Sequence, residues 1–251
     1  MYRKQINQYL QKHGFEEINL KAVLFDMDGV LFDSMKNHAY SWSTAMTQFG
    51  LTMTAEEAYM HEGRTGAGTI NILSQRQWGR DATEEEKQII YKGKSDIFNS
   101  CPPAEPMPGA LDLLRKIKAD GIQIQVVTGS AQSSLLDRLN SHFPDIFKPE
   151  LMVTAFDVKY GKPNPEPYLM GLKKGGIKAN EAIVVENAPL GVQAAVAADI
   201  FTVAVNTGPL PDSVLTDAGA NLLFSSMNEL SQSWESLRES FGTPPSISTD
   251  F

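Results

Sequence analysis

Cysteine is almost absent from the sequence: Cys101 stands alone, so no disulfide can form within the chain. Lack of disulfides fits a reducing compartment, and we expect a cytoplasmic protein. No run of about 18 apolar residues occurs, which excludes an ordinary membrane-spanning helix. The polar first residues lack the apolar core of a secretory signal. Basic residues are also scarce, because 22 Lys and Arg against 30 Asp and Glu give a formal net charge of −8. This balance argues against a partner such as nucleic acid or an anionic membrane.

Short apolar runs recur along the chain, and they predict buried strands. Each run is rich in strand-forming residues and apolar throughout, as in strands that are covered on both faces. They lie at residues 22–25, 122–127, 151–153, 183–185 and 201–205. Helical patterns separate them, for example the one opened by Pro108-Gly109 and closed by Asp120-Gly121. Alternating strands and helices predict an α/β fold with a parallel sheet between two helical layers.

One long segment interrupts this alternation. Residues 36–104 place their apolar side chains mostly at helical spacing, and we interpret them as a helical cap inserted after the first strand. The exit from the cap, residues 101–108, is dense in proline and resembles a hinge linker. The predicted organisation is an N-terminal extension (1–17), a core (18–35 and 105–242), the cap (36–104) and a flexible tail (243–251).

Polar residues follow the predicted strands at the points where the strands end. The first strand is followed by Asp26–Gly29, the second by Thr128–Ser130, the third, after a loop, by Gly161–Pro163, and the fourth by Glu186 and Asn187. Ligands of open parallel sheets bind beyond the carboxyl ends of the strands. We therefore expect these side chains to converge on one pocket.

The chemistry of such a pocket is phosphoryl transfer. Asp26 can attack phosphorus as a nucleophile, and Asp28 can act as general acid and base. Lys162 can neutralise the phosphoryl oxygens, while Thr128 and the backbone N–H groups of Gly129 and Ser130 hold the phosphate. Oxygen donors of this kind suit Mg²⁺. The predicted metal ligands are Asp26, Asp28 through its backbone carbonyl, Glu186 and Asn187.

The ordered set of motifs resembles the haloacid dehalogenase superfamily, in the branch similar to β-phosphoglucomutase. The resemblance spans roughly residues 20–225 and is carried by Asp26–Ser34, Val126–Ser130, Gly161–Pro163 and Val185–Asn187 with Gly191. It implies a Rossmann-like core, a mobile helical cap and a required Mg²⁺. The family usually has Glu-Asp in the fourth motif, whereas this chain has Glu186-Asn187, so one negative charge is missing.

The cap contributes further candidates for substrate binding. The loop His61–Gly66 occupies the position of the branch's substrate-specificity loop, and in it Arg64 is a natural phosphate ligand. We expect Glu62 to approach the metal and to replace the missing charge; the alternative is an ion pair with Arg64 or a lysine. By resemblance, His38 and Lys94 match a cap histidine and a phosphate-binding lysine. The alternatives are a packed histidine and a solvated helix lysine.

These residues favour a Mg²⁺-dependent phosphohydrolase that acts on a small phosphorylated substrate. Within the branch, the loop at residues 61–66 and the motif at 186–191 resemble bacterial inorganic pyrophosphatases, so pyrophosphate is a candidate substrate. A β-phosphoglucomutase-like hexose-phosphate mutase is the alternative, because it would use the same groups. A catalytically inactive phospholigand sensor is a remote alternative, supported by Asn187 alone. We expect a monomer or a weak homodimer.

Overall fold

The computed structural model describes residues 2–129 and 135–242, so Ser130 and the predicted tail lie outside the described residues. Within them a six-stranded parallel sheet has the order β3-β2-β1-β4-β5-β6. The strands are β1 (Ala22–Phe25), β2 (Gln123–Val127), β3 (Met152–Val153), β4 (Ala182–Glu186), β5 (Phe201–Val205) and β6 (Leu222–Phe224). The predicted α/β fold is confirmed; the short β6 was not predicted.

The first strand lies at the centre of the sheet because it pairs with β2 on one side and β4 on the other. Val23 is aligned with Ile124 and with Ile183. All four residues of β1 are buried, which explains why its sequence is apolar without alternation. The chain changes its direction of winding at β1, and this is the position where open α/β sheets bind ligands.

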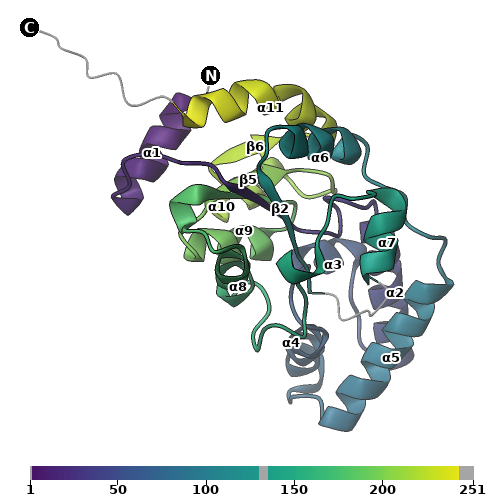
Figure 1. The fold of residues 1–251 in the computed structure, drawn as a ribbon. Helices are drawn as coiled ribbons and strands as arrows, with labels where there is room; N and C mark the ends of the chain where they lie inside the picture. Colours follow the sequence, from purple (N-terminus) through teal and green to yellow (C-terminus); the bar gives the residue numbers. More distant parts are fainter. Residues whose placement is uncertain (1, 130–134, 243–251) are drawn as a thin grey trace, which may run out of the picture.

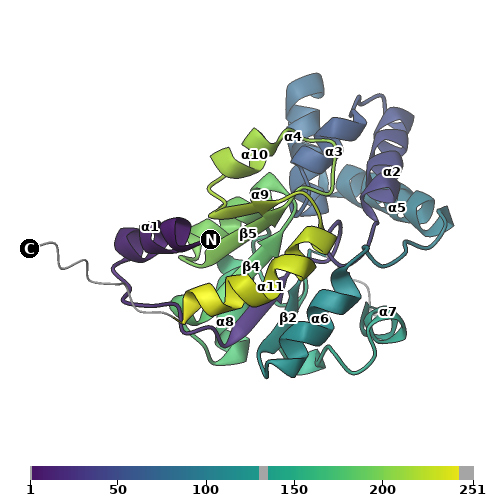
Figure 2. The same cartoon turned by 90° about the horizontal axis from the view of Figure 1, so that it is seen from above.

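Helices cover both faces of the sheet (Figures 1 and 2). Val23 and Phe25 belong to the apolar core on one face, and Ala22 and Leu24 to the core on the other. The first face packs against α1 (Arg3–His13), α6 (Ala110–Ala119), α7 (Leu135–His142) and α11 (Met227–Phe241). The second face packs against α8 (Glu166–Gly175) and α9 (Pro189–Ala197). The remaining elements are α10 (Asp212–Asp217) and the 3₁₀ turns η1 (Pro149–Leu151) and η2 (Ala179–Glu181).

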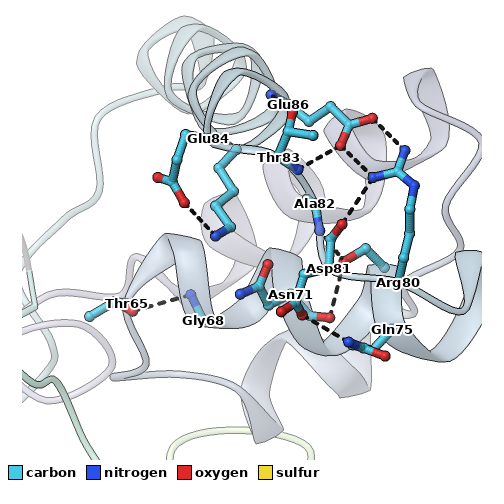
Figure 3. A network of polar contacts seen from close by, with 12 residues as sticks. Thr65, Gly68, Asn71, Gln75, Arg80, Asp81, Ala82, Thr83, Glu84 and Glu86 are labelled. Atoms are coloured by element: carbon cyan, nitrogen blue, oxygen red, sulfur yellow. Dashed lines mark hydrogen bonds and ion pairs between the residues drawn. The ribbon is translucent and has the colours of Figure 1, made fainter.

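The segment between β1 and α6 is helical and has its own apolar cluster, built from residues between Ala39 and Ile90. Its helices are α2 (Met35–Gln48), α3 (Ala55–Met60), α4 (Gly66–Trp78) and α5 (Glu84–Ser100). Figure 3 shows how α5 begins: Thr83 and Glu86 form a capping box, and Arg80 pairs with Glu86. Such reciprocal caps satisfy N–H groups that a helix start would otherwise leave free.

The two linkers that connect this helical segment to the sheet lie side by side. The N–H of Asp33 donates to the carbonyl of Glu105 at 2.9 Å, and the N–H of Met107 donates to the carbonyl of Leu31 at 2.8 Å. The side chain of Asn37 also donates to the carbonyl of Pro102 at 2.9 Å. Two adjacent linkers suit a hinge, although the division into core and cap at residues 36 and 104 stays a prediction.

The N-terminal helix packs onto the core. Ile6 and Tyr9 of α1 are buried in the main apolar cluster, and the Tyr9 hydroxyl donates to the carbonyl of Asp199 at 2.7 Å. In α8 Tyr168 is buried, whereas the neighbouring Leu169 is 48% exposed. None of the helices in the described ranges is long and apolar enough to cross a membrane.

Candidate active site

The carboxyl ends of β1 and β4 meet at a buried lysine. The Lys162 ammonium donates to Asp26 Oδ1, to Glu186 Oε1 at 2.6 Å and to the carbonyl of Val127 at 3.2 Å. All three charged side chains are buried. Burial opposes the charged form of Lys162, but the two carboxylates outweigh it and raise the pKa of the lysine. Lys162 is therefore a permanent cation next to the predicted nucleophile.

Both carboxylate oxygens of Glu186 accept hydrogen bonds from protein groups. Oε1 accepts from Lys162 and from the Tyr168 hydroxyl at 2.6 Å, and Oε2 accepts from the N–H of Asn187 at 3.0 Å. A Cβ at Gly191 would lie 1.8 Å from Glu186 Oε1, so a glycine is required there. In this arrangement Glu186 orients Lys162, and its role as a metal ligand stays a prediction.

Asp28 is held from two sides. The Ser34 hydroxyl donates to Asp28 Oδ1 at 2.5 Å, and His38 Nε2 lies 3.3 Å from the same oxygen. Burial opposes ionisation of Asp28, but the charge of His38 and the hydrogen bonds from His38 and Ser34 hold its pKa below the usual range. The carboxylate form of Asp28 is favoured, which is the form that can accept a proton.

A chain of contacts runs from Asp28 into the helical segment. The Lys94 ammonium lies 3.0 Å from His38 Nδ1, and His38 stacks on Phe98 with ring centroids 4.3 Å apart. Lys94 is buried and faces the rings of Phe98 and Trp42 at 4.7 and 5.5 Å. Burial lowers the pKa of Lys94 to about 8. The alternative of a solvated Lys94 is therefore wrong, whereas His38 both packs and forms a hydrogen bond.

The loop His61–Gly66 enters the site from the helical segment. Asn187 Nδ2 donates to Glu62 Oε2 at 3.3 Å, and a Cβ at Gly63 would lie 2.7 Å from the Lys162 side chain. The other oxygens of this pair, Glu62 Oε1 and Asn187 Oδ1, are buried and accept no hydrogen bond. Among the described residues Glu62 makes no ion pair with Arg64 or with a lysine.

Asp26, Asp28, His38 and Glu62 line a cavity of about 320 Å³. Thr128 and Gly129 line it from the core, together with Arg138 of α7; Arg64 and Lys94 line it from the helical segment. The N–H of Thr128 donates to the carbonyl of Val153 at 2.9 Å, which fixes the strand end. The structure thus brings together the predicted site residues that it describes, while Ser130 lies outside the described part of the chain.

Negative charge is in excess around the nucleophile. Asp26, Asp28, Glu62 and Glu186 lie close together, and of these Asp26 and Glu186 contact the ammonium group of Lys162. Burial and the charges of Glu186 and Asp28 raise the pKa of Asp26 to about 8, against the opposing charge of Lys162. Burial, Asp26 and Asp28 likewise raise the pKa of Glu62 well above its usual value.

The free oxygens suit a hard divalent cation. Glu62 Oε1 and Asn187 Oδ1 lack partners, and oxygen donors with a net negative charge are what Mg²⁺ prefers. Across residues 2–129 and 135–242, no cluster of three or more His, Cys, Asp or Glu forms a ready metal site. The candidate set differs from such a cluster because it includes an amide oxygen.

Comparison with known proteins identifies the family. A family model described as haloacid dehalogenase-like hydrolase matches residues 23–205, which is more than half of the chain. The chain belongs to the haloacid dehalogenase-like hydrolases. Its phosphatase and phosphomutase relatives make it an enzyme of phosphoryl transfer, and an inactive sensor has no support among them.

Three relatives of this hydrolase illustrate the family. Hexitol phosphatase A of Escherichia coli K12 is 32% identical over 187 residues, covering 74% of this chain and 83% of that protein. A phosphorylated carbohydrates phosphatase of Thermotoga maritima is 29% identical over 202 residues, 80% of this chain and 92% of its own. A solved structure from Bacteroides vulgatus, described as a candidate beta-phosphoglucomutase, is 65% identical with a TM-score of 0.94, and the match covers 96% and 98% of the two chains.

Sequence reasoning missed three residues of the hydrolase site. Tyr168 donates to Glu186, Ser34 donates to Asp28, and Arg138 lines the cavity. Ser34 closes the first motif, and that position could have signalled it. Tyr168 and Arg138 lie on helix faces, where the helical pattern predicts burial or exposure but not a partner.

Proposed function

We propose that this enzyme is a Mg²⁺-dependent phosphohydrolase acting through an aspartyl-phosphate at Asp26, with inorganic pyrophosphate as the leading candidate substrate. The observation that carries the proposal is the contact between Glu62 and Asn187 at 3.3 Å. This contact adds a carboxylate where the fourth motif lacks one. Glu62 also lines the cavity together with Asp26, and a carboxylate in that position favours a compact and highly charged substrate.

The reaction needs two transfers at phosphorus. An Asp26 oxygen attacks the phosphoryl group, and the bond from phosphorus to the leaving oxygen breaks with its electron pair. Lys162, held on Asp26 and Glu186, neutralises the charge that develops on the phosphoryl oxygens. Asp28 then takes a proton from water, which attacks the aspartyl-phosphate and releases phosphate.

The surroundings of Asp28 support pyrophosphate over a sugar ester. The Ser34 hydroxyl and His38 Nε2 both lie on Asp28 Oδ1, an arrangement that favours the carboxylate, which is a good base but a poor acid. A sugar alkoxide needs a proton in order to leave, whereas phosphate leaves as a stable anion. A site with an ionised Asp28 is therefore better suited to a phosphate leaving group.

The same residues would hold Mg²⁺. The candidate ligands are Asp26, the Asp28 carbonyl, Asn187 Oδ1 and Glu62 Oε1, the last two being buried oxygens without a partner. Bound there, the ion supplies positive charge to the phosphoryl oxygens. Glu186 stays a predicted ligand although its oxygens already accept hydrogen bonds from protein groups.

We also propose that residues 36–104 close over the substrate, hinging at residues 33–36 and 102–108. The support is that Glu62, Arg64 and Lys94 all belong to the inserted segment and line the cavity, and that the linkers run side by side. Closure would exclude bulk water from the intermediate. Solution scattering that shows the same shape with and without a phosphate analogue and Mg²⁺ would contradict it.

A hexose-phosphate mutase is the second candidate. The similarity to a candidate beta-phosphoglucomutase and to phosphatases named for sugar substrates favours it. One assay separates the two functions: phosphate release from pyrophosphate against conversion of β-glucose 1-phosphate to glucose 6-phosphate, each with Mg²⁺ and with excess chelator. Conversion without phosphate release would overturn the hydrolase proposal, and turnover unaffected by the chelator would overturn the role of Mg²⁺.

A further inference from the structure

Arg138 is an arginine of the core that reaches the cavity and has no role in the mechanism given above. It belongs to α7 and lines the cavity together with Thr128 and Gly129. Its guanidinium carbon lies 4.1 Å from the centre of the Phe32 ring. Phe32 is fully buried, so the ring is a fixed platform that limits where the guanidinium can lie.

Arg138 forms no ion pair with a carboxylate among the residues that the structure describes. Its Nη2 atom is buried and has no hydrogen-bond partner, and within the described residues no carboxylate lies within ion-pair distance of it. Arg76 and Arg80 of the helical segment instead pair with Glu57 and Glu86. A buried donor without a partner is costly, which favours a ligand that supplies the missing acceptor.

Arg138 lies on the same side of the cavity as Asp28, because its guanidinium packs on Phe32 and Phe32 is joined to Asp28 by a backbone bridge. Its positive charge also lowers the pKa of Asp28 and of His38. Lys162 lies against Asp26, where the reacting phosphoryl group is attacked. Arg138 is thus placed toward the group that leaves, and Lys162 toward the group that is transferred.

We propose that Arg138 binds the anionic leaving group and selects substrates that carry a second phosphate there. The inference rests on the proposed function and adds a residue that sets substrate class. A planar guanidinium can donate two parallel hydrogen bonds to phosphate oxygens. A neutral leaving group would leave the buried Nη2 atom of Arg138 without an acceptor. Because α7 packs with the sheet, Arg138 can bind before the cap brings Arg64 to the substrate.

The test compares Arg138→Met and Arg138→Lys with a matched control, Arg80→Met. Methionine keeps an apolar side chain over Phe32 and removes the positive charge. Lysine keeps the charge but cannot donate two parallel hydrogen bonds as a guanidinium does. Arg80 also lies over an aromatic ring, Trp78 at 5.0 Å, but it pairs with Glu86 on the surface of the helical segment (Figure 3). Kinetics are measured with pyrophosphate and with p-nitrophenyl phosphate, whose leaving group carries no phosphate.

Arg138→Met should raise KM for pyrophosphate by about 10- to 100-fold, as expected for loss of charged hydrogen bonds. For p-nitrophenyl phosphate kcat/KM should change by less than about 3-fold. Arg138→Lys should lie between the wild type and Arg138→Met, and Arg80→Met should match the wild type. Equal losses on both substrates, or no loss on pyrophosphate, would overturn the proposal.

A binding measurement separates this inference from the proposed function. If the wild type does not cleave pyrophosphate, the proposed function fails, and calorimetric titration with methylenediphosphonate then tests Arg138 alone. The proposal predicts binding that is about 10-fold or more weaker in Arg138→Met than in the wild type. Equal affinity would overturn it. If Arg138→Met does not fold, the same comparison is made with Arg138→Lys, where wild-type affinity for the diphosphonate and wild-type KM would overturn it.

Discussion

Two buried lysines face the active site from opposite sides, and they differ in what surrounds their charge. Lys162, in the core, contacts the carboxylates of Asp26 and Glu186, which raise its pKa. Lys94, in the cap segment, contacts a histidine and two aromatic rings, and burial lowers its pKa to about 8. Lysine is thus a permanent cation at position 162, whereas the charge of Lys94 depends on pH near neutrality.

The difference indicates a division of labour between the two sides. The groups to which we assign the chemistry lie at the ends of the strands, where opposite charges and a backbone carbonyl hold Lys162 in place. In the helical segment Glu62 and Lys94 instead contact neutral groups, the amide of Asn187 and the rings of Trp42 and Phe98. The predictions below test whether this division holds.

The largest effect is expected from the core nucleophile. Asp26→Asn should abolish turnover, because an amide cannot form the acyl-phosphate. The fold should survive, since the amide still accepts a hydrogen bond from Lys162. Steady-state phosphate release measures the effect, and activity within tenfold of the wild type would show that another group attacks phosphorus.

The second core residue should matter slightly less. Asp28→Asn should lower kcat by about 10²- to 10⁴-fold, the usual range for loss of a residue that transfers a proton. Aspartyl-phosphate should then accumulate, because activation of water is lost while the attack by Asp26 persists. Trapping of labelled enzyme after acid quench measures it; normal turnover in this variant would place the proton transfer elsewhere.

The two lysines can be compared directly through their methionine variants. Lys162→Met leaves two buried carboxylates without a cation and should lower the free energy of unfolding by about 3–5 kcal/mol. Lys94→Met replaces a buried ammonium by an apolar group of similar length, so the cost should stay below about 1.5 kcal/mol. Urea unfolding at neutral pH provides both values. Equal losses would show that the core and cap lysines are not held differently.

Glu62, the acidic residue of the loop His61–Gly66, tests the contact between the helical segment and the core. Glu62→Ala should raise the Mg²⁺ concentration needed for half-maximal activity and lower kcat/KM for pyrophosphate by about tenfold, with a smaller loss on a bulky phosphate ester. Glu56→Ala, on the exposed surface of α3, is the matched control. Unchanged metal activation and unchanged substrate preference would remove Glu62 from the site.

The last comparison concerns the pH dependence of Lys94. The pKa of Lys94 is about 8 in the folded chain and 10.5 for an ordinary lysine, so between these values the unfolded chain binds more protons. Stability linked to Lys94 should therefore rise with pH between about 8 and 10.5, by at most about 1.4 kcal/mol per pH unit. The difference in unfolding free energy between wild type and Lys94→Met isolates this contribution. A difference that does not change with pH would mean that Lys94 keeps its ordinary pKa.

Much of the core could be read from the sequence because its signals are local. The apolar run Ala22–Phe25 followed by Asp26 predicts a buried strand that ends in a carboxylate, and parallel strands place their ends at one edge. Asp26, Lys162 and Glu186 indeed meet there. The buried position of Lys94 could not be predicted, because the sequence of α5 is mostly polar around this residue and gives no sign that its side chain is buried.

The sequence by itself determined the α/β fold, the family and the core residues that reach the pocket, because strand ends and short motifs are set by neighbouring residues. Only the tertiary structure decided which side chains meet across the chain. Glu62 reaches Asn187 over 125 positions, Lys94 reaches His38 over 56, and Arg138 finds Phe32 through the packing of α7. Such contacts depend on how the helices pack against one another and on how far the side chains extend. Neither can be predicted from the pattern of neighbouring residues in the sequence.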